Sequence, residues 1–298
     1  MKKNNNFKKK YVTLSILLVV ILVASYVGFK IYTSNYYAAD KAVIDDIREH
    51  VGDRVMSFTD ATGTVFIPSD GQTKAVIVFY PGGKVEFSAY SGLMYELSEM
   101  GYVCVIPRMP DNLAFLGIDV VDDIRKKYAD EMIMAGDVKW YLAGHSLGGV
   151  AASKYLAEKA DNKEAAIGDG KADSTTGSGP GDGKISAEEI ASAGESVNGG
   201  FAGLILCASY PVDDLSESGL RFLSVYAEKD SVINLEKYEE SRAFWPKDST
   251  ERIINGGIHS FFGCYGIQAG DGVPDISNQT QLDETAKIID EWITGRNE

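Results

Sequence analysis

Mainly apolar runs of strand length, separated by stretches with helical spacing, limit most strongly the fold that this chain can adopt. The runs lie at residues 75–80 (AVIVFY), 102–107, 138–143, 201–209 and 220–227. Residues 75–80 are continuously apolar, as expected of a strand buried on both faces, and the other runs have the length and composition of strands. Helical patterns occur at 88–100, 117–130, 148–159 and 280–293. Strands that alternate with helices predict an α/β fold, with a mainly parallel central sheet and helices on both of its faces.

The first 33 residues have a different character. Residues 11–29 contain no charge, and at about 1.5 Å per residue they span roughly 28 Å, close to the hydrocarbon core of a bilayer. Five lysines precede this run, which predicts a single-pass signal anchor with residues 1–10 in the cytoplasm and the following domain outside. The alternative is a cleaved signal peptide that leaves a secreted protein.

Composition suggests how the whole chain is divided. We expect a basic tail at 1–10, a transmembrane anchor at 11–32, a linker helix at 33–53 and one α/β domain at 54–298. An acidic, glycine-rich insertion at 161–200 has no apolar periodicity long enough for a core element. The whole chain carries a formal net charge of −14, although its first 33 residues hold only basic charges. An acidic body repels phosphate backbones, so no nucleic-acid partner is expected.

One motif has the context of a nucleophilic serine. Residues 144–148 read GHSLG and match G-x-S-x-G, between an apolar β-type run and a small-residue helical pattern. A sharp strand-to-helix turn of this kind exposes the hydroxyl of Ser146, and glycines at 144 and 148 permit close packing. It also places the N–H of Leu147 at a helix N-terminus, where it favours a negatively charged oxygen. The alternative is a glycine-rich turn with an idle serine.

A nucleophilic serine needs a general base and an acid that orients it. Among the three histidines, His259 follows an apolar pair and a glycine-rich loop, whereas His50 precedes the domain and His145 lies inside the motif. For the acid, Asp230 follows the 220–227 run at the expected point of the chain order Ser–acid–His. Asp213 and Asp214 follow the preceding run and are alternatives, and Glu228 is a weaker one.

The second donor to an oxyanion is expected in the loop that follows residues 75–80. That loop reads Pro81-Gly82-Gly83-Lys84, and its glycines let the backbone approach a bound oxygen atom. We predict that the N–H of Gly83 is this donor, together with that of Leu147. The alternative is a plain turn.

With these motifs in place, the chain resembles the α/β-hydrolase superfamily, most closely its bacterial serine-hydrolase branch near the dienelactone-hydrolase-like proteins. The resemblance rests on VFYPGGKVEFSAY, GYVCVIPRMPDNLAF, WYLAGHSLGGVAASKY, LILCASYP, YAEKDSV and GGIHSFFGCYGIQAGDG. It covers roughly residues 64–160 and 201–298. It implies an α/β-hydrolase fold, a Ser146–Asp230–His259 triad and hydrolysis of an ester or similar acyl bond. Dienelactone hydrolases proper use a cysteine nucleophile, so their specific activity does not carry over to Ser146.

The acidic insertion contains half of a calcium-binding pattern. Residues 182–189 (DGKISAEE) fit the second half of an EF-hand loop, in which Lys184 would offer its carbonyl and Glu189 a bidentate carboxylate. The first half departs from the pattern, since Pro180 and Ser178 stand where acids are expected. An enlarged loop would recruit Asp169 and Asp173 beside Asp182, and the ion would be structural. The alternative is a flexible acidic loop.

These features favour a membrane-anchored, extracytoplasmic serine hydrolase of the carboxylesterase type. Its partners would be a small acyl-ester substrate and, through the N-terminal helix, the membrane. The catalysis would need no cofactor. Two alternatives are a non-catalytic surface-binding protein with an α/β-hydrolase-like domain and an acyltransferase that uses the same triad.

Overall fold

The computed structural model describes residues 3–129, 138–169 and 200–296. The chain divides into two compact units, residues 1–36 and residues 37–298. The α-helices are α1 (Lys3–Ser34), α2 (Lys41–Val51), α3 (Ser91–Glu99), α4 (Val120–Ala129), α5 (Leu147–Asp169), α7 (Leu235–Glu240) and α8 (Asn278–Thr294). The 3₁₀ turns are η1 (Gly52–Arg54), η2 (Phe87–Tyr90), η3 (Pro110–Asn112), η4 (Ala114–Leu116), η5 (Ser241–Phe244) and η6 (His259–Phe262).

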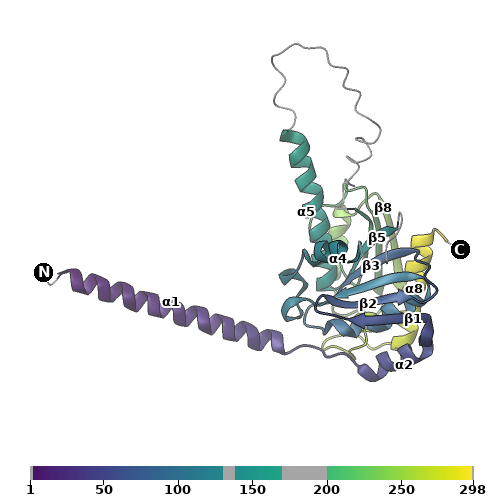
Figure 1. Cartoon of the computed structure of the whole chain (residues 1–298), viewed down its shortest axis with the longest axis horizontal. Helices are drawn as coiled ribbons and strands as arrows, with labels where there is room; N and C mark the ends of the chain where they lie inside the picture. Colours follow the sequence, from purple (N-terminus) through teal and green to yellow (C-terminus); the bar gives the residue numbers. More distant parts are fainter. Residues whose placement is uncertain (1–2, 130–137, 170–199, 297–298) are drawn as a thin grey trace, which may run out of the picture. The chain divides into compact units, whose positions relative to one another are not determined.

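The first unit consists mainly of α1, drawn in purple in Figure 1. Within it, Lys10–Ser34 is long and apolar enough to cross a membrane. The predicted apolar helix is therefore present, although a signal sequence has the same length and composition.

The second unit is built on an eight-stranded sheet. Its strands are β1 (Val55–Thr59), β2 (Gly63–Pro68), β3 (Ala75–Tyr80), β4 (Tyr102–Pro107), β5 (Lys139–His145), β6 (Phe201–Cys207), β7 (Arg221–Ala227) and β8 (Asp248–Ile254). Their spatial order is β1-β2-β4-β3-β5-β6-β7-β8. The pairs β1–β2 and β2–β4 are antiparallel, whereas all pairs from β4 to β8 are parallel. The predicted mainly parallel sheet is confirmed.

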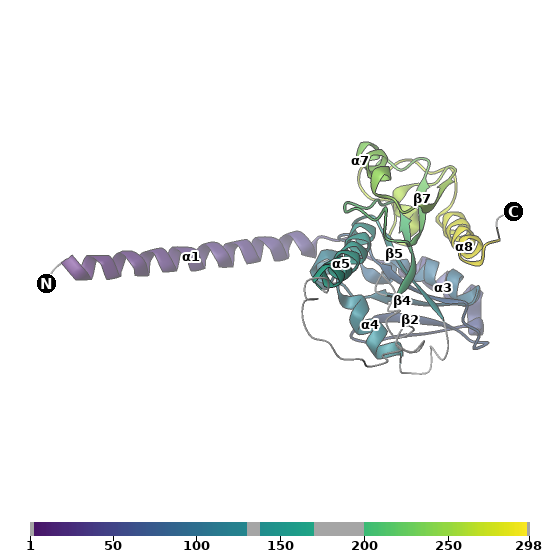
Figure 2. The same ribbon diagram turned by 90° about the horizontal axis from the view of Figure 1, so that it is seen from above.

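Helices cover both faces of the sheet, as the alternation of elements predicted (Figure 2). Successive residues of β3 enter two different cores, because side chains alternate across a strand. Ile77 and Phe79 belong to the core that includes residues of α2, α3 and α8. Val76 and Val78 belong to the core that includes residues of α4 and α5. All six residues of β3 are buried, which explains its uninterrupted apolar sequence.

Helix α2 lies within residues 33–53, for which the sequence predicted a linker helix. Asp40 caps its N-terminus by accepting hydrogen bonds from the N–H groups of Ala42 and Val43. Its Ile47 and Val51 are buried in the core that includes α3 and α8. The helix is therefore packed into the α/β body.

The predicted insertion lies largely outside the described residues. Helix α5 continues to Asp169, and the structure describes the chain again from Gly200. Asp173, Asp182, Lys184 and Glu189 lie outside the described residues, and nothing is described of the side chain of Asp169. The EF-hand-like calcium site thus stays a prediction.

Candidate functional site

The G-x-S-x-G motif forms the turn between β5 and α5. Ser146 has φ 51°, in the left-handed region that a residue with a side chain seldom adopts. Its backbone is held on both sides, because its N–H donates to the carbonyl of Cys207 (3.0 Å) and its carbonyl accepts from Ser209 Oγ (2.7 Å). The strained conformation is the one expected of a residue whose side chain stands out from a strand–helix turn.

The two glycines of the motif are required by close backbone packing. A Cβ on Gly144 would lie 2.6 Å from the amide nitrogen of Gly149 in the first turn of α5. A Cβ on Gly148 would overlap the carbonyl oxygens of Tyr80 and Pro81 at the end of β3. The turn is therefore pressed against both its own helix and the neighbouring strand.

His259 and Asp230 form a buried pair in the loops that follow β8 and β7. His259 Nδ1 lies 2.7 Å from Asp230 Oδ2, and both side chains are at most 2% exposed. The other carboxylate oxygen, Oδ1, accepts the backbone N–H groups of Val232 and Ile233, each at 2.8 Å. Because the carboxylate only accepts, the neutral imidazole of His259 has its proton on Nδ1 and its lone pair on Nε2.

The four candidate acids have different partners in the structure. Asp213 Oδ2 lies 4.0 Å from Lys154 Nζ, and Asp214 Oδ1 accepts the N–H of Ser216. Glu228 Oε2 accepts the N–H of Gly256. Asp230 is the one of these four acids whose carboxylate is hydrogen-bonded to His259.

The loop after β3 lies against the start of α5, where the sequence predicted an oxyanion site. A Cβ on Gly83 would lie 2.6 Å from Leu147 Cδ2 and 3.2 Å from Leu147 Cβ, so the two residues are in contact. Within the described residues, neither the N–H of Gly83 nor that of Leu147 is hydrogen-bonded to another residue. The two predicted donors lie at adjoining positions, one of them at the N-terminus of α5.

Sequence reasoning missed two residues that anchor this region. Tyr90, in η2, has its hydroxyl hydrogen-bonded to His145 Nδ1 at 2.8 Å. Asp271 accepts the N–H groups of His259 (3.3 Å) and Ser260 (2.7 Å), and so holds the backbone of the His259 loop. Their partners are distant along the chain, so no local pattern marks them.

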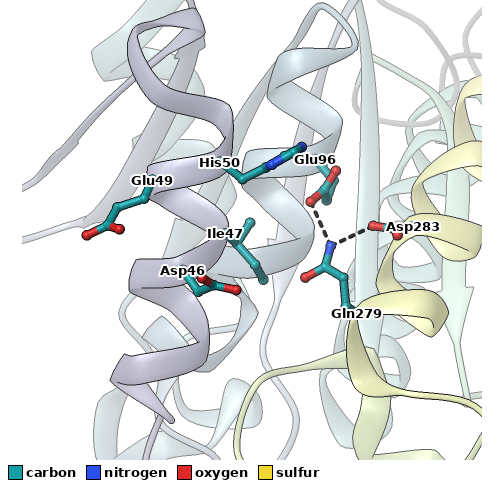
Figure 3. Close-up of a pocket in the computed structure, with 7 residues that line it drawn as sticks. All are labelled: Asp46, Ile47, Glu49, His50, Glu96, Gln279 and Asp283. Atoms are coloured by element: carbon teal, nitrogen blue, oxygen red, sulfur yellow. Dashed lines mark hydrogen bonds between the residues drawn. The ribbon is translucent and has the colours of Figure 1, made fainter.

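A second polar region lies among α2, α3 and α8 (Figure 3). This pocket is formed by α2, α3 and α8 and is lined by Asp46, Ile47, Glu49, His50, Glu96, Gln279 and Asp283. The amide of Gln279 donates to Glu96 Oε1 (2.9 Å) and Asp283 Oδ1 (2.6 Å). Burial raises the pKa of Glu96 above its usual 4.5. Within the described residues, no group of three or more His, Cys, Asp or Glu is placed to hold a metal ion.

The sheet order, the strand–helix turn at Ser146 and the buried His259–Asp230 pair define an α/β-hydrolase type of protein. A family model described as "Alpha/beta hydrolase family" matches residues 76–168 and 180–283, more than half of the chain. The chain therefore belongs to the alpha/beta hydrolase family, and a hydrolase-type activity follows from that membership. No curated protein matches the chain. The dienelactone-hydrolase-like branch stays a prediction.

Proposed function

We propose that the chain is a serine hydrolase that cleaves an ester or related acyl bond through Ser146, His259 and Asp230. The observation that carries this proposal is the buried Asp230–His259 hydrogen bond of 2.7 Å, which presents Nε2 as the basic nitrogen. The ring of His259 lies 4.5 Å, centroid to centroid, from that of His145, the residue just before Ser146. The proposed base therefore contacts the residue that precedes the proposed nucleophile.

The reaction begins when His259 Nε2 takes the proton of Ser146 Oγ as this oxygen attacks the acyl carbonyl. The carbonyl π electrons move to the oxygen, and the N–H groups of Gly83 and Leu147 stabilise the resulting oxyanion. Asp230 orients the imidazole and stabilises its cation. Collapse of the tetrahedral intermediate expels the alcohol, which receives the proton from His259, and leaves an acyl-enzyme. Water, deprotonated by His259, then releases the carboxylic acid and regenerates Ser146.

The test is labelling with a fluorophosphonate probe together with hydrolysis of p-nitrophenyl esters of graded chain length. We expect the probe to label the wild-type chain and Ser146→Ala to lose both labelling and turnover, since removal of a triad member typically costs more than about 10³-fold in kcat. A folded wild-type chain that resists the probe and hydrolyses no ester would favour the non-catalytic binding protein instead. Ester exchange with added alcohols, in place of hydrolysis, would favour the acyltransferase.

We also propose that α1 anchors the enzyme in the cell membrane, with the catalytic unit extracytoplasmic. The apolar stretch Lys10–Ser34 and the five lysines among residues 2–10 support this orientation. Fractionation and mass determination of the mature chain test the proposal: retention of residues 1–33 in the membrane fraction is expected. A soluble product that begins after this stretch would show that α1 is a cleaved signal peptide.

A further inference from the structure

A continuous chain of buried hydrogen bonds runs beside the proposed triad. The N–H of Gly82 donates to the hydroxyl oxygen of Tyr90 at 2.9 Å. The same hydroxyl lies 2.8 Å from His145 Nδ1, and His145 Nε2 lies 3.1 Å from the carbonyl oxygen of His259. Tyr90, His145 and His259 are each at most 1% exposed. Solvent therefore offers these groups no substitute partners.

The direction of each hydrogen bond in this network follows from the carbonyl oxygen of His259, at which the network ends. A carbonyl oxygen only accepts, so His145 must carry a proton on Nε2. Its Nδ1 then holds a lone pair, which accepts the hydroxyl proton of Tyr90. The imidazole is neutral in this arrangement, and burial correspondingly lowers the pKa of His145 well below 6.5 while it raises the pKa of Tyr90.

The network connects three segments that carry the proposed oxyanion donor, the proposed nucleophile and the proposed base. Gly82 precedes Gly83, the proposed oxyanion donor after β3. His145 precedes Ser146 at the end of β5, and the third position is His259 itself, in the loop after β8. The side chain of His145 thus joins all three segments, through Tyr90 on one ring nitrogen and directly on the other.

The groups that face His145 explain why a neutral ring is suited to this position. The ring of His259 lies 4.5 Å away, that of Tyr90 5.6 Å and that of Phe262 5.6 Å, centroid to centroid. His259 becomes a cation in the proposed reaction, and a second cation at this distance would destabilise it. A neutral imidazole keeps both hydrogen bonds and avoids that repulsion.

We propose that His145 is a positioning residue, which holds the oxyanion loop, the nucleophile turn and the His259 loop in register through one neutral imidazole. The role rests on the proposed serine-hydrolase function but is separate from the triad, because His145 uses both ring nitrogens for these links. Small displacements of reacting groups have large kinetic consequences: a shift of about 1 Å costs about 10²-fold in rate.

The experiment uses the full chain in detergent micelles. Active sites are titrated with a fluorophosphonate, and kcat and KM for p-nitrophenyl acetate are expressed per titrated site. His145→Phe keeps the ring volume but removes both links, and we expect kcat to fall about 10²-fold with KM changed by less than about threefold. His145→Gln, whose amide N–H can replace Nε2–H, is expected to recover part of the lost rate.

Tyr90→Phe tests the link between His145 and Gly82 in this hydrogen-bond network. It removes the hydroxyl that joins Gly82 to His145, so kcat is expected to fall about 10-fold. The double variant Tyr90→Phe/His145→Phe should be no slower than His145→Phe alone, because residues of one network are not additive. Tyr238→Phe is the matched control. The buried hydroxyl of Tyr238 is hydrogen-bonded to Ser224 and Glu251, which are not part of the Tyr90–His145 network, so kcat should be unchanged.

Nitrogen-detected histidine spectra give an independent readout, with the Nε2–H form of His145 expected between pH 5 and 8. A role in stability alone would lower the melting temperature and the number of titrated sites while kcat per site stayed at the wild-type value, and that result would overturn the inference. If the wild-type chain neither labels nor hydrolyses, the proposed function and this inference fail together. If it does both and His145→Phe keeps its kcat, only the positioning role fails.

Discussion

The region around His259 and Asp230 and the pocket around His50 both contain a histidine and carboxylates, yet their geometry differs. His259 is buried and hydrogen-bonded to Asp230, whose second oxygen is held by two backbone N–H groups. His50 is exposed on α2, and the acids of its pocket come from three helices. Acid–base catalysis needs a fixed orientation and a defined lone pair rather than a number of acids. This difference supports the proposal that the reaction takes place at His259, and we expect the His50 pocket to be dispensable for it.

The sharpest test of this comparison is Asp230→Asn. The amide can donate to His259 Nδ1, which would move the ring proton to Nε2 and remove the lone pair needed for proton abstraction. A loss of kcat of about 10⁴-fold is expected, measured with p-nitrophenyl acetate on folded protein. Asp213→Asn is the matched control and should keep its kcat. If Asp230→Asn kept wild-type activity, the acid assigned to the triad would be wrong.

Gly148→Ala tests the packing of the nucleophile turn. The added Cβ would overlap the carbonyl oxygens of Tyr80 and Pro81, so β3 and α5 would have to separate. We expect a loss of unfolding free energy of about 3 kcal/mol, measured by chemical denaturation. Gly219→Ala is the comparison, because Gly219 has φ +69° with open space around it, and only the backbone strain of about 1 kcal/mol applies there. Equal losses would contradict the packing argument.

Gly83→Ala perturbs the oxyanion site with little change in stability. Its Cβ would lie 2.6 Å from Leu147 Cδ2, the end of a side chain that can move. We expect the displacement to lower kcat about 10-fold, less than the loss of a donor. Leu147→Ala keeps the N–H and removes the clashing atom, so the double variant Gly83→Ala/Leu147→Ala should recover rate. No recovery would mean that the contact between these residues does not control the rate.

The smallest effect is expected in the His50 pocket. Burial raises the folded-state pKa of Glu96 above its unfolded value, so the folded chain binds this proton more tightly. This contribution to stability is fully present below the usual pKa of 4.5 and is lost as the pH rises through the raised folded pKa. Glu96→Gln should therefore unfold less readily than wild type at pH 7, by less than about 1 kcal/mol, measured in denaturant at pH 4 and 7. A large loss of kcat in this variant would instead connect the pocket to the reaction.

The parts of the fold that follow from local patterns were predictable. The uninterrupted apolar sequence of β3 indicates a strand buried on both faces, and the structure confirms it. The sequence around Ser146 predicts a strand, a tight turn and a helix, and β5 and α5 meet there. By contrast, the roles of Tyr90 and Asp271 depend on partners far along the chain, and a single sequence has no periodicity that reports such contacts.

The sequence by itself determined the alternation of strands and helices, the strand–helix turn at Ser146 and a short set of candidate partners. Only the tertiary structure decided that Asp230, rather than Asp213 or Asp214, is hydrogen-bonded to His259, and that His145 uses both ring nitrogens in links to other segments. The reason is physical: backbone conformation and burial patterns are encoded over a few neighbouring residues, whereas a hydrogen bond between side chains requires that distant loops meet within about 3 Å.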